Sequence, residues 1–283
     1  MYIVLGGTGH IGRVLTRELL KRNEKVLVVT HSPDKVEAIK SIGAQAAVAD
    51  VLDTYRLHEV FKKGKRLFLL NPPADPSADI DIEERRSIRS ILSALKGSGL
   101  EKIVAESTYG AQPGDSLGDL GVLYEMEQGL EAQEIPATII RSAYYYSNWD
   151  MALESAKNEG KLYTFFPADF RLPMVAPADI AKLAAQLLIE PVNKKKLCYR
   201  SGPEDYSPTD VAAAFSKALK KPVEVAEIPK EEWVSTMMQA GYSSKSAESM
   251  AYMTEVTLRN HEQPQNPERG TITIDEYIGN LMK

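Results

Sequence analysis

A short segment near the start of the chain, Gly6-Gly7-Thr8-Gly9-His10-Ile11-Gly12, holds glycines at its first, fourth and seventh positions. Residues 2–5 before it are apolar and predict a strand, and residues 11–22 carry apolar side chains at helical spacing. In such a unit one glycine permits the tight turn, one lets backbone amides approach a phosphate, and one lets the helix lie close to the strand. Because residues 25–30 predict a second strand at the expected distance, we interpret the segment as a dinucleotide-binding turn rather than an ordinary glycine turn.

The helix after the glycines supplies the rest of the binding chemistry. Its first N–H groups have no partner within the helix, and the helix dipole adds a partial positive charge for the pyrophosphate. For His10 the backbone matters more than the ring, because the residue sits inside the turn. We therefore predict that the cofactor contacts Gly6, Thr8, Gly9, His10, Ile11 and Gly12.

Apolar runs and amphipathic stretches continue to alternate after this unit. Helices are predicted over 35–42, 57–62, 80–95 and 120–133, and strands over 44–49, 66–70, 102–106 and 137–141. Strands separated by helices pair in parallel through right-handed crossovers. The pattern therefore predicts an α/β fold with a Rossmann-type doubly wound parallel sheet.

The alternation loosens after residue 141. Residues 144–173 are aromatic, polar and irregular, and Pro177 and Asp179 then open a helix that runs to about residue 189. Further helices are predicted at 208–219 and 231–240. We predict that residues 1–150 form the NAD(P)-binding domain, with 174–190 packed back on it, and that 151–173 and 191–283 form a smaller α+β lobe on the substrate side.

The composition argues against several other classes of protein. The 283 residues carry 34 Lys and Arg against 39 Asp and Glu, and a net charge of −5 gives no sign of direct contact with nucleic acid. No apolar run approaches the roughly 18 residues of a membrane span, and we expect no secretory leader. Cys198 is the single cysteine, so we expect no internal disulfide and a cytoplasmic protein. The four histidines, His261 among them, are scattered, and we expect no metal site.

The end of the second predicted strand bears on which dinucleotide is bound. An NAD-selective site usually places Asp or Glu there to accept hydrogen bonds from the ribose 2′-hydroxyl, but this chain has Thr30 and His31. A 2′-phosphate is better matched by His31, Ser32 and Lys35, with the lysine as a point charge. Asp34 lies close by, and a polar loop without a ligand is the alternative. We predict NADP(H) in preference to NAD(H).

Several later segments complete a resemblance to a known family. They are Ala49-Asp50-Val51, Leu69-Leu70-Asn71-Pro72, the tyrosine-rich residues 141–148, Ser201-Gly202-Pro203-Glu204 and Glu231-Glu232-Trp233. Together with the glycine turn, their order and spacing over nearly the whole chain resemble the NmrA-like group of atypical short-chain dehydrogenases/reductases. That group includes NADPH-sensing regulators and NAD(P)H:quinone reductases.

The resemblance implies how the adenosine half of the cofactor lies. Asp50 and Val51 would stand at the adenine edge, and Asn71 and Pro72 would line the side of the groove next to the adenosine ribose. These four residues follow predicted strands, as expected for a ligand at the carboxyl edge of a parallel sheet.

The resemblance also implies the surroundings of the nicotinamide. Ser107 and Thr108, at the end of the fifth strand, would face it, with Tyr109 near the substrate. The family usually keeps an aromatic residue at the place of Tyr145 and an asparagine at Asn148. We expect at least one of the tyrosines at 144–146 to border this pocket, and the alternative is that all three pack in the core or at its rim.

The chain departs from the Tyr-x-x-x-Lys pair with which short-chain dehydrogenases move a proton. If Glu127 is aligned with the family's helix glutamate, the lysine place falls at Leu123 and the tyrosine place at Asp119. A shifted candidate, Tyr124, is followed four residues later by Gln128, which has no charge to lower the pKa of a phenol. We expect Tyr124 to lie at the pocket wall.

The missing pair favours one class of acceptor. Hydride transfer to a simple ketone creates an alkoxide that needs a positioned general acid, whereas a quinone spreads the incoming charge and can take its proton from water later. We therefore expect a reductase that transfers hydride from NADPH to a quinone or a similar electron-poor small molecule. The alternative is a non-catalytic NADP(H) sensor with a regulatory protein partner. A sugar-nucleotide epimerase is disfavoured because the proton-transfer tyrosine is missing.

Overall fold

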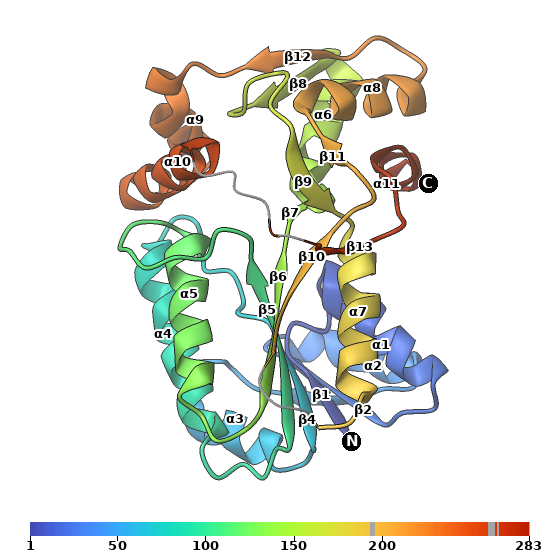
Figure 1. Ribbon diagram of the computed structural model, residues 1–283, viewed down its shortest axis with the longest axis vertical. Helices are drawn as coiled ribbons and strands as arrows, with labels where there is room; N and C mark the ends of the chain where they lie inside the picture. The colour runs from blue at the N-terminus through green and yellow to red at the C-terminus, as the bar shows by residue number, and fades with distance from the viewer. Residues whose placement is uncertain (193–195, 260–263, 265, 283) are drawn as a thin grey trace.

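The computed structural model describes residues 1–192, 196–259, 264 and 266–282. Its largest element is a sheet of parallel strands (Figure 1), formed by β1 (Tyr2–Val4), β2 (Val26–Thr30), β3 (Gln45–Val48), β4 (Arg66–Leu69), β5 (Lys102–Thr108), β6 (Ala137–Ser142), β10 (Lys196–Ser201) and β13 (Glu268–Arg269). Their spatial order is β13-β10-β6-β5-β4-β1-β2-β3. The order reverses at β1 and β4, which makes this a doubly wound sheet with a crevice at the carboxyl ends of these strands.

Helices cover both faces of this sheet. One layer contains α1 (His10–Lys21), α2 (Val36–Ser41) and α7 (Pro177–Ile189), with the short helix η1 (Pro33–Lys35) before α2, and the other contains α3 (Thr54–Phe61), α4 (Ile80–Leu95) and α5 (Asp119–Glu131). Successive strand residues alternate between the two cores, as with Val4 in the first and Ile3 in the second. The predicted α/β fold is thereby confirmed.

A smaller lobe stands beyond the carboxyl edge of the sheet (Figure 1). It contains a three-stranded sheet of β7 (Tyr144–Tyr145), β9 (Leu172–Val175) and β11 (Asp205–Tyr206), and a pair of strands, β8 (Lys161–Thr164) and β12 (Glu224–Glu227). Around them lie η2 (Tyr146–Ala152), α6 (Leu153–Asn158), α8 (Pro208–Leu219), η3 (Lys230–Glu232), α9 (Trp233–Gln239), α10 (Ser244–Arg259) and α11 (Ile274–Leu281). The lobe has a hydrophobic core of its own, built around Tyr146, Leu162 and Phe215.

The chain passes between the two lobes repeatedly. β6 leads into β7, β9 into α7, β10 into β11, and β13 into α11. The last passage is held by Asp179 in the first turn of α7, whose buried carboxylate accepts the backbone N–H groups of Thr271 (2.9 Å) and Ile272 (3.0 Å). Lys182 Nζ lies 3.4 Å and Arg200 Nη2 4.0 Å from the same carboxylate.

Two stretches of the smaller lobe differ from the prediction. Residues 144–173, predicted to be irregular, form β7, η2, α6, β8 and β9, and these strands pair with partners distant in the chain, such as β8 with β12. Helix α10 is absent from the prediction. It docks on the main domain through Met253 and Val256, which pack with Leu117 and Leu120, and through serines, which add nothing to an apolar period. Ser246 Oγ accepts the N–H of Ile80 (3.1 Å), and Ser249 Oγ accepts that of Gly118 (2.9 Å).

The predicted division at residue 191 does not follow the strands. β10 and β13 lie within the range predicted for the smaller lobe, yet both join the main sheet, with β10 beside β6. The two lobes share the C-terminal third of the chain, and a boundary in sequence between them stays a prediction.

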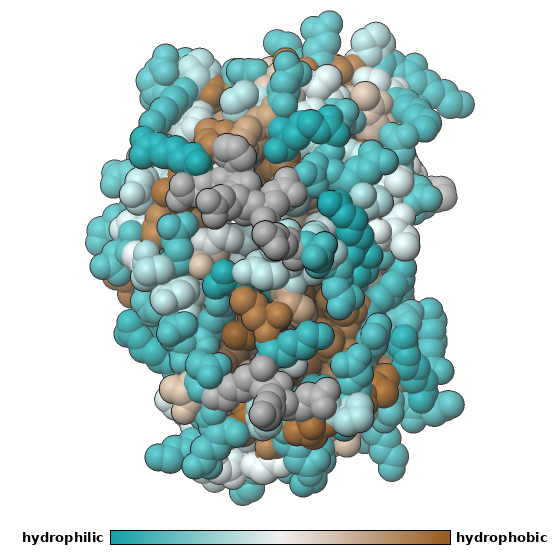
Figure 2. All heavy atoms as spheres, in the orientation of Figure 1, coloured by the Kyte–Doolittle hydropathy of each residue, from teal (hydrophilic) through white to brown (hydrophobic). Residues whose placement is uncertain are grey.

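The surface in the orientation of Figure 1 is mainly hydrophilic, and hydrophobic residues gather between α5 and α7 (Figure 2). Strands β6 and β10 run through this part of the view, and Leu197 on β10 is 45% exposed. Within the described residues, no helix has both the length and the apolar character that a membrane span requires.

Candidate functional site

The glycine turn between β1 and α1 has the geometry that a dinucleotide requires. Gly6 has a φ of +67°, which glycine adopts without strain. A Cβ on Gly12 would lie 2.3 Å from Gly6 O, and a Cβ on Gly7 would lie 2.5 Å from Val28 Cγ1, so α1 and β2 press directly on the turn. A Cβ on Gly9, by contrast, would meet nothing nearer than Gly6 O at 3.5 Å. The protein thus encloses Gly7 and Gly12 but leaves the approach to Gly9 open.

The open side of the turn is the start of α1. Thr8, Gly9 and His10 are exposed, α1 has no side-chain cap at Gly9, and its first turn contains no acidic residue. Free N–H groups and the positive end of the helix therefore face outward where a pyrophosphate fits. His10 Nε2 lies 4.0 Å from Asp150 Oδ2 on η2, so the turn also approaches the smaller lobe.

The residues predicted for the 2′-phosphate surround the carboxyl end of β2. His31 and Lys35 are exposed, and Ser32 is half-buried with its N–H donated to Thr30 Oγ1 (3.2 Å). Asp34 shares the short helix η1 with Lys35 and is also exposed. The structure brings the candidate cations together at one strand end, and their role in NADP selectivity stays a prediction.

The residues predicted for the adenosine half lie at neighbouring strand ends. Ala49 N donates to Thr30 O (3.0 Å), which sets Asp50 and Val51 beside the end of β2. Asn71 follows β4, and its buried Oδ1 has no hydrogen-bond partner within the described residues. An unpaired buried amide oxygen costs free energy unless a donor reaches it, and a ribose hydroxyl is a donor of the right kind. These observations fit a bound dinucleotide.

Ser107 is held rigidly below the carboxyl edge. Its buried Oγ donates to Glu127 Oε1 (2.5 Å), and Glu127 on α5 also receives two hydrogen bonds from Arg141, Nε to Oε1 at 2.9 Å and Nη2 to Oε2 at 2.6 Å. Glu127 raises the pKa of the Arg141 guanidinium. A two-point ion pair of this kind fixes both side chains. Ser107 is thus held in place but is 0% exposed, and its contact with the nicotinamide stays a prediction.

The three consecutive tyrosines have three different environments. Tyr146 is fully buried, donates to Ile272 O (3.2 Å) and belongs to the core of the smaller lobe. Tyr144 is half-buried and packs edge-on against Phe166, with ring centroids 5.6 Å apart. Tyr145 is half-buried and donates its phenol to Glu106 Oε1 (2.8 Å). Only Tyr145 makes a polar side-chain contact with the end of β5, which makes it the tyrosine of the three that best suits the nicotinamide pocket.

The other pocket candidates are more loosely arranged. Tyr109 N donates to Ser142 O (2.9 Å), its hydroxyl is buried beside Ser201, and burial raises its pKa to about 12. Tyr124 is half-buried on α5, and Asn148 is exposed on η2. The structure gives neither of the last two a contact with Ser107.

Acidic residues that the sequence analysis missed lie at the same edge. Glu106, directly before Ser107, is 2% exposed, and burial raises its pKa to about 8. Glu84 on α4 is also buried, and burial together with Asp119 raises its pKa to about 8. The sequence offered one signal for Glu106: it is a charged residue inside an apolar strand, whereas a buried parallel strand is normally a continuous apolar run. The described residues contain no cluster of ligands suited to a metal ion.

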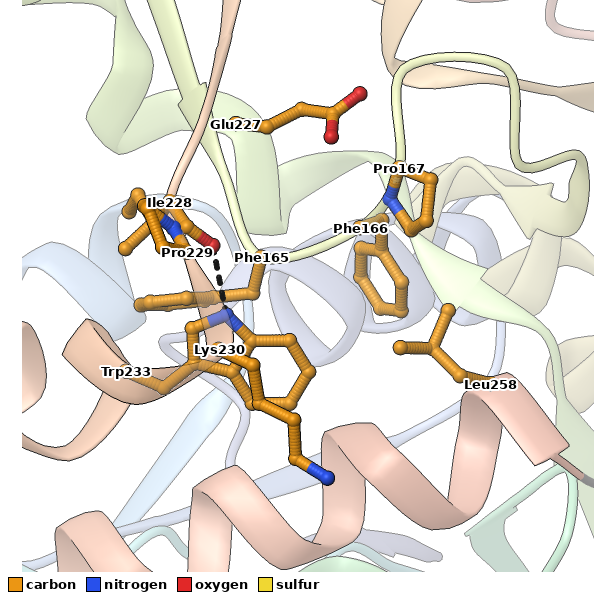
Figure 3. Close-up of a pocket in the computed structure, with 9 residues that line it drawn as sticks. All are labelled: Phe165, Phe166, Pro167, Glu227, Ile228, Pro229, Lys230, Trp233 and Leu258. Carbon is orange, nitrogen blue, oxygen red and sulfur yellow. Dashed lines mark hydrogen bonds between the residues drawn. The ribbon is translucent and has the colours of Figure 1, made fainter.

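A separate cavity of about 390 Å³ lies in the smaller lobe. Figure 3 shows Phe165 and Trp233 on one side of it and Phe166 and Leu258 on the other, with Lys230 at its margin. Trp233 Nε1 donates to Ile228 O (2.8 Å), which fixes the indole. Because Phe166 also packs on Tyr144, aromatic rings connect this cavity to the strand that carries Tyr145.

Known proteins resemble the chain over most of its length. It is 25% identical over 251 residues to an NAD(P)H azoreductase from Xenophilus azovorans, covering 88% of this chain and 85% of that protein. It is 22% identical over 253 residues to quinone oxidoreductase 2 from Escherichia coli, covering 89% and 86%.

Solved structures share the fold. An NADPH-dependent quinone oxidoreductase from Escherichia coli, complexed with NADPH, superposes with a TM-score of 0.78 at 20% identity, covering 100% of both chains. A nucleoside-diphosphate-sugar epimerase from Staphylococcus aureus superposes with a TM-score of 0.81 at 19% identity, covering 98% and 99%.

The family model that matches this chain is that of the NmrA-like family, and the match runs over residues 2–280. It includes the glycine turn, the strand ends that surround it and the smaller lobe. The resemblance noted in the sequence is therefore confirmed: the chain belongs to the NmrA-like family, a family of NAD(P)-binding Rossmann-fold oxidoreductases.

Proposed function

We propose that this protein is an NADPH-dependent reductase that delivers hydride to a quinone or a similar electron-poor aromatic acceptor. The observation that carries the proposal is the shared edge of the sheet: the open glycine turn and the fixed Ser107 lie at the carboxyl ends of β1 and β5, which β4 separates, with the smaller lobe above them. The names of its relatives, an azoreductase and a quinone oxidoreductase, support the same reaction class.

The residues of the chain have distinct tasks in this proposal. The amides around Gly9 bind the pyrophosphate, Asn71 pairs with the ribose, and Ser107 orients the nicotinamide. The cofactor, when bound, supplies the hydride. The smaller lobe places aromatic side chains above this edge, and flat aromatic acceptors stack well on such rings.

The second candidate is a redox sensor that binds NADP(H) without turnover. It is favoured by Asp119 and Leu123 at the places of the proton-transfer pair: Asp119 begins α5, and Leu123 packs against an apolar core. Neither residue can act as the tyrosine or the lysine of a dehydrogenase. A non-catalytic sensor would lack this pair in the same way.

The deciding experiment follows NADPH oxidation at the nicotinamide absorbance with benzoquinones, naphthoquinones and simple aldehydes as acceptors. We expect faster turnover with quinones than with aldehydes. Tight binding of NADPH without turnover of any acceptor would establish the sensor instead. Faster reduction of aldehydes would show that simple carbonyl compounds are the preferred acceptors, contrary to this proposal.

The preference for NADP(H) predicts unequal effects of two substitutions. Lys35→Ala and His31→Ala should each weaken NADPH binding by about tenfold, because a charged hydrogen bond to phosphate is worth about 1.5 kcal/mol or more. NADH binding should stay within twofold. Fluorescence titration with both cofactors measures this, and Lys40→Ala, an exposed lysine on α2 paired with Glu37, is the matched control. Equal losses of affinity for NADPH and NADH would show that Lys35 and His31 do not contact the 2′-phosphate.

A further inference from the structure

Tyr145 and Glu106 form a hydrogen-bonded pair beside the residues expected at the nicotinamide. Tyr145 Oη lies 2.8 Å from Glu106 Oε1. Glu106 directly precedes Ser107 in β5, and Tyr145 lies in β7, which follows β6, the neighbour of β5 in the sheet. The pair therefore links the end of β5 to the segment that follows β6. The hydrogen bond from Tyr109 N to Ser142 O connects the ends of β5 and β6 directly.

The surroundings of Glu106 favour its neutral form. Glu106 is 2% exposed, its hydrogen-bonding neighbours Tyr145 and Ser142 are neutral, and no lysine, arginine or histidine among the described residues forms an ion pair with it. A buried carboxylate without a cation is strongly disfavoured. Burial accordingly raises the pKa of Glu106 to about 8.

The titratable neighbours of the pair provide no positive charge. Tyr145 from β7 and Cys198 from β10 interact with Glu106, and α1 and α7 contribute apolar side chains such as Leu15 and Ile180 to the core on this face of the sheet. Asp119, at the start of α5, acts on Tyr145 from the other side. Burial, then Glu106 and then Asp119 raise the pKa of the Tyr145 phenol well above its ordinary value. Near neutral pH the Tyr145 phenol and the Glu106 carboxyl each carry a proton. The hydrogen bond between them uses one of these two protons.

We propose that Tyr145 donates the proton that completes reduction of the acceptor, and that Glu106 replaces this proton on Tyr145. The inference rests on the reductase function proposed above. As the acceptor gains two electrons and a hydrogen as hydride, its oxygen becomes an anion, and the reduced nicotinamide is oxidised. The Tyr145 O–H bond breaks while a new O–H bond forms on the acceptor, and the Glu106 carboxylic acid passes its proton to Tyr145 Oη. A proton from water then returns to the Glu106 carboxylate through Tyr145, which is half-buried.

In this scheme Tyr145 is a catalytic residue, and Glu106 acts through it as a positioning and proton-supplying residue. Glu106 can pass a proton to Tyr145 only in its acid form, which is lost as the pH rises through about 8. The rate of quinone reduction should therefore fall about tenfold per pH unit above that value. A cationic triphenylmethane dye gains only a hydride and needs no proton, so its reduction should show no such fall.

The variants are Tyr145→Phe and Glu106→Gln, with Tyr163→Phe as the matched control. Tyr163 on β8 donates to Glu159 (2.7 Å), the same type of pair, but it is 44% exposed and lies in the smaller lobe. Single-turnover oxidation of bound NADPH is measured with a naphthoquinone and with the dye. Tyr145→Phe should slow the quinone reaction about 100-fold, the lower range for general acid catalysis, and leave the dye reaction within twofold. Glu106→Gln should abolish the fall above pH 8, and the control should change nothing.

A measurement without turnover tests the state of Glu106 directly. Infrared difference spectra of the ligand-free protein should show protonated carboxyl absorption at pH 7 that is lost as the pH rises through about 8, and Glu106→Gln should lose the share of Glu106 and keep that of Glu84. A band unchanged in the variant would overturn the role of Glu106.

The kinetic outcomes separate the two proposals. If the wild type reduces neither acceptor, the reductase function fails. If the wild type reduces the quinone but Tyr145→Phe keeps its rate and its solvent isotope effect, the proton transfer alone fails. Equal losses with quinone and dye would mean that Tyr145 only positions the acceptor. Should the dye prove no substrate, a solvent isotope effect of about two that vanishes in Tyr145→Phe supports the transfer, and one that persists overturns it.

Discussion

Replacement of Gly12 by alanine should weaken NADPH binding by at least about 100-fold, the usual effect of displacing a positioning element by about 1 Å. The added Cβ would lie 2.3 Å from Gly6 O and 2.6 Å from Gly7 Cα, and both neighbours are backbone atoms of the turn itself. They can yield only if α1 moves away from β1, which displaces the amides that bind the pyrophosphate. Overpacking of this kind also costs about 1–3 kcal/mol of stability. Isothermal titration with NADPH and urea unfolding measure the two effects.

Gly9→Ala separates cofactor binding from folding. Its Cβ meets no protein atom nearer than 3.5 Å, so unfolding should change by at most about 1 kcal/mol, the range for a helix N-cap. NADPH binding should still fall, because the methyl group occupies the open approach to the amides. Gly279→Ala in α11, where no atom lies within 4 Å, is the control. Unchanged NADPH binding in Gly12→Ala would show that the turn does not hold the pyrophosphate.

Asp179→Ala should destabilise the protein by about 3–5 kcal/mol, the usual cost of breaking a buried charge interaction from one side. The substitution leaves the N–H groups of Thr271 and Ile272 without their acceptor and leaves Arg200 with Glu268 as its remaining nearby anion. It also releases the C-terminal segment from α7. The free energy of unfolding in urea, measured at the same pH for wild type and variant, tests this prediction.

The exposed pair Lys217–Asp275 (2.6 Å) provides the comparison for Asp179. Asp275→Ala removes a shorter ion pair, but solvent screens it, and the loss should stay below about 1 kcal/mol. Similar losses in the two variants would mean that the carboxylate of Asp179 contributes no more than a surface charge.

The main sheet was predictable because each of its early units is local in sequence. Within residues 1–106, a strand, its crossover helix and the next strand follow one another, and the observed ends lie close to those inferred from apolar periodicity. The glycine turn was predictable for the same reason: its strand, glycines and helix are contiguous. Glu127 was singled out as an anchor, although its bonds to Ser107 and Arg141 came only from the structure.

The smaller lobe and the acidic residues of the site were not predictable by the same reasoning. Strand β8 pairs with β12, and α10 docks partly through Ser246 and Ser249, whose polar contacts leave no hydrophobic period in the sequence. The pair of Glu106 and Tyr145 joins residues 39 positions apart, and no local spacing relates them. Residue types in a sequence show which groups are available, but distant pairing decides which of them meet.

The repeated passages of the chain between the lobes have a mechanical consequence. Two bodies joined by one linker swing freely, whereas these are joined side by side through β6–β7, β9–α7, β10–β11 and β13–α11. A rotation that stretches one connection compresses another, so the connections oppose rotation of one lobe against the other. A single proteolytic cut in one connection leaves the two lobes attached.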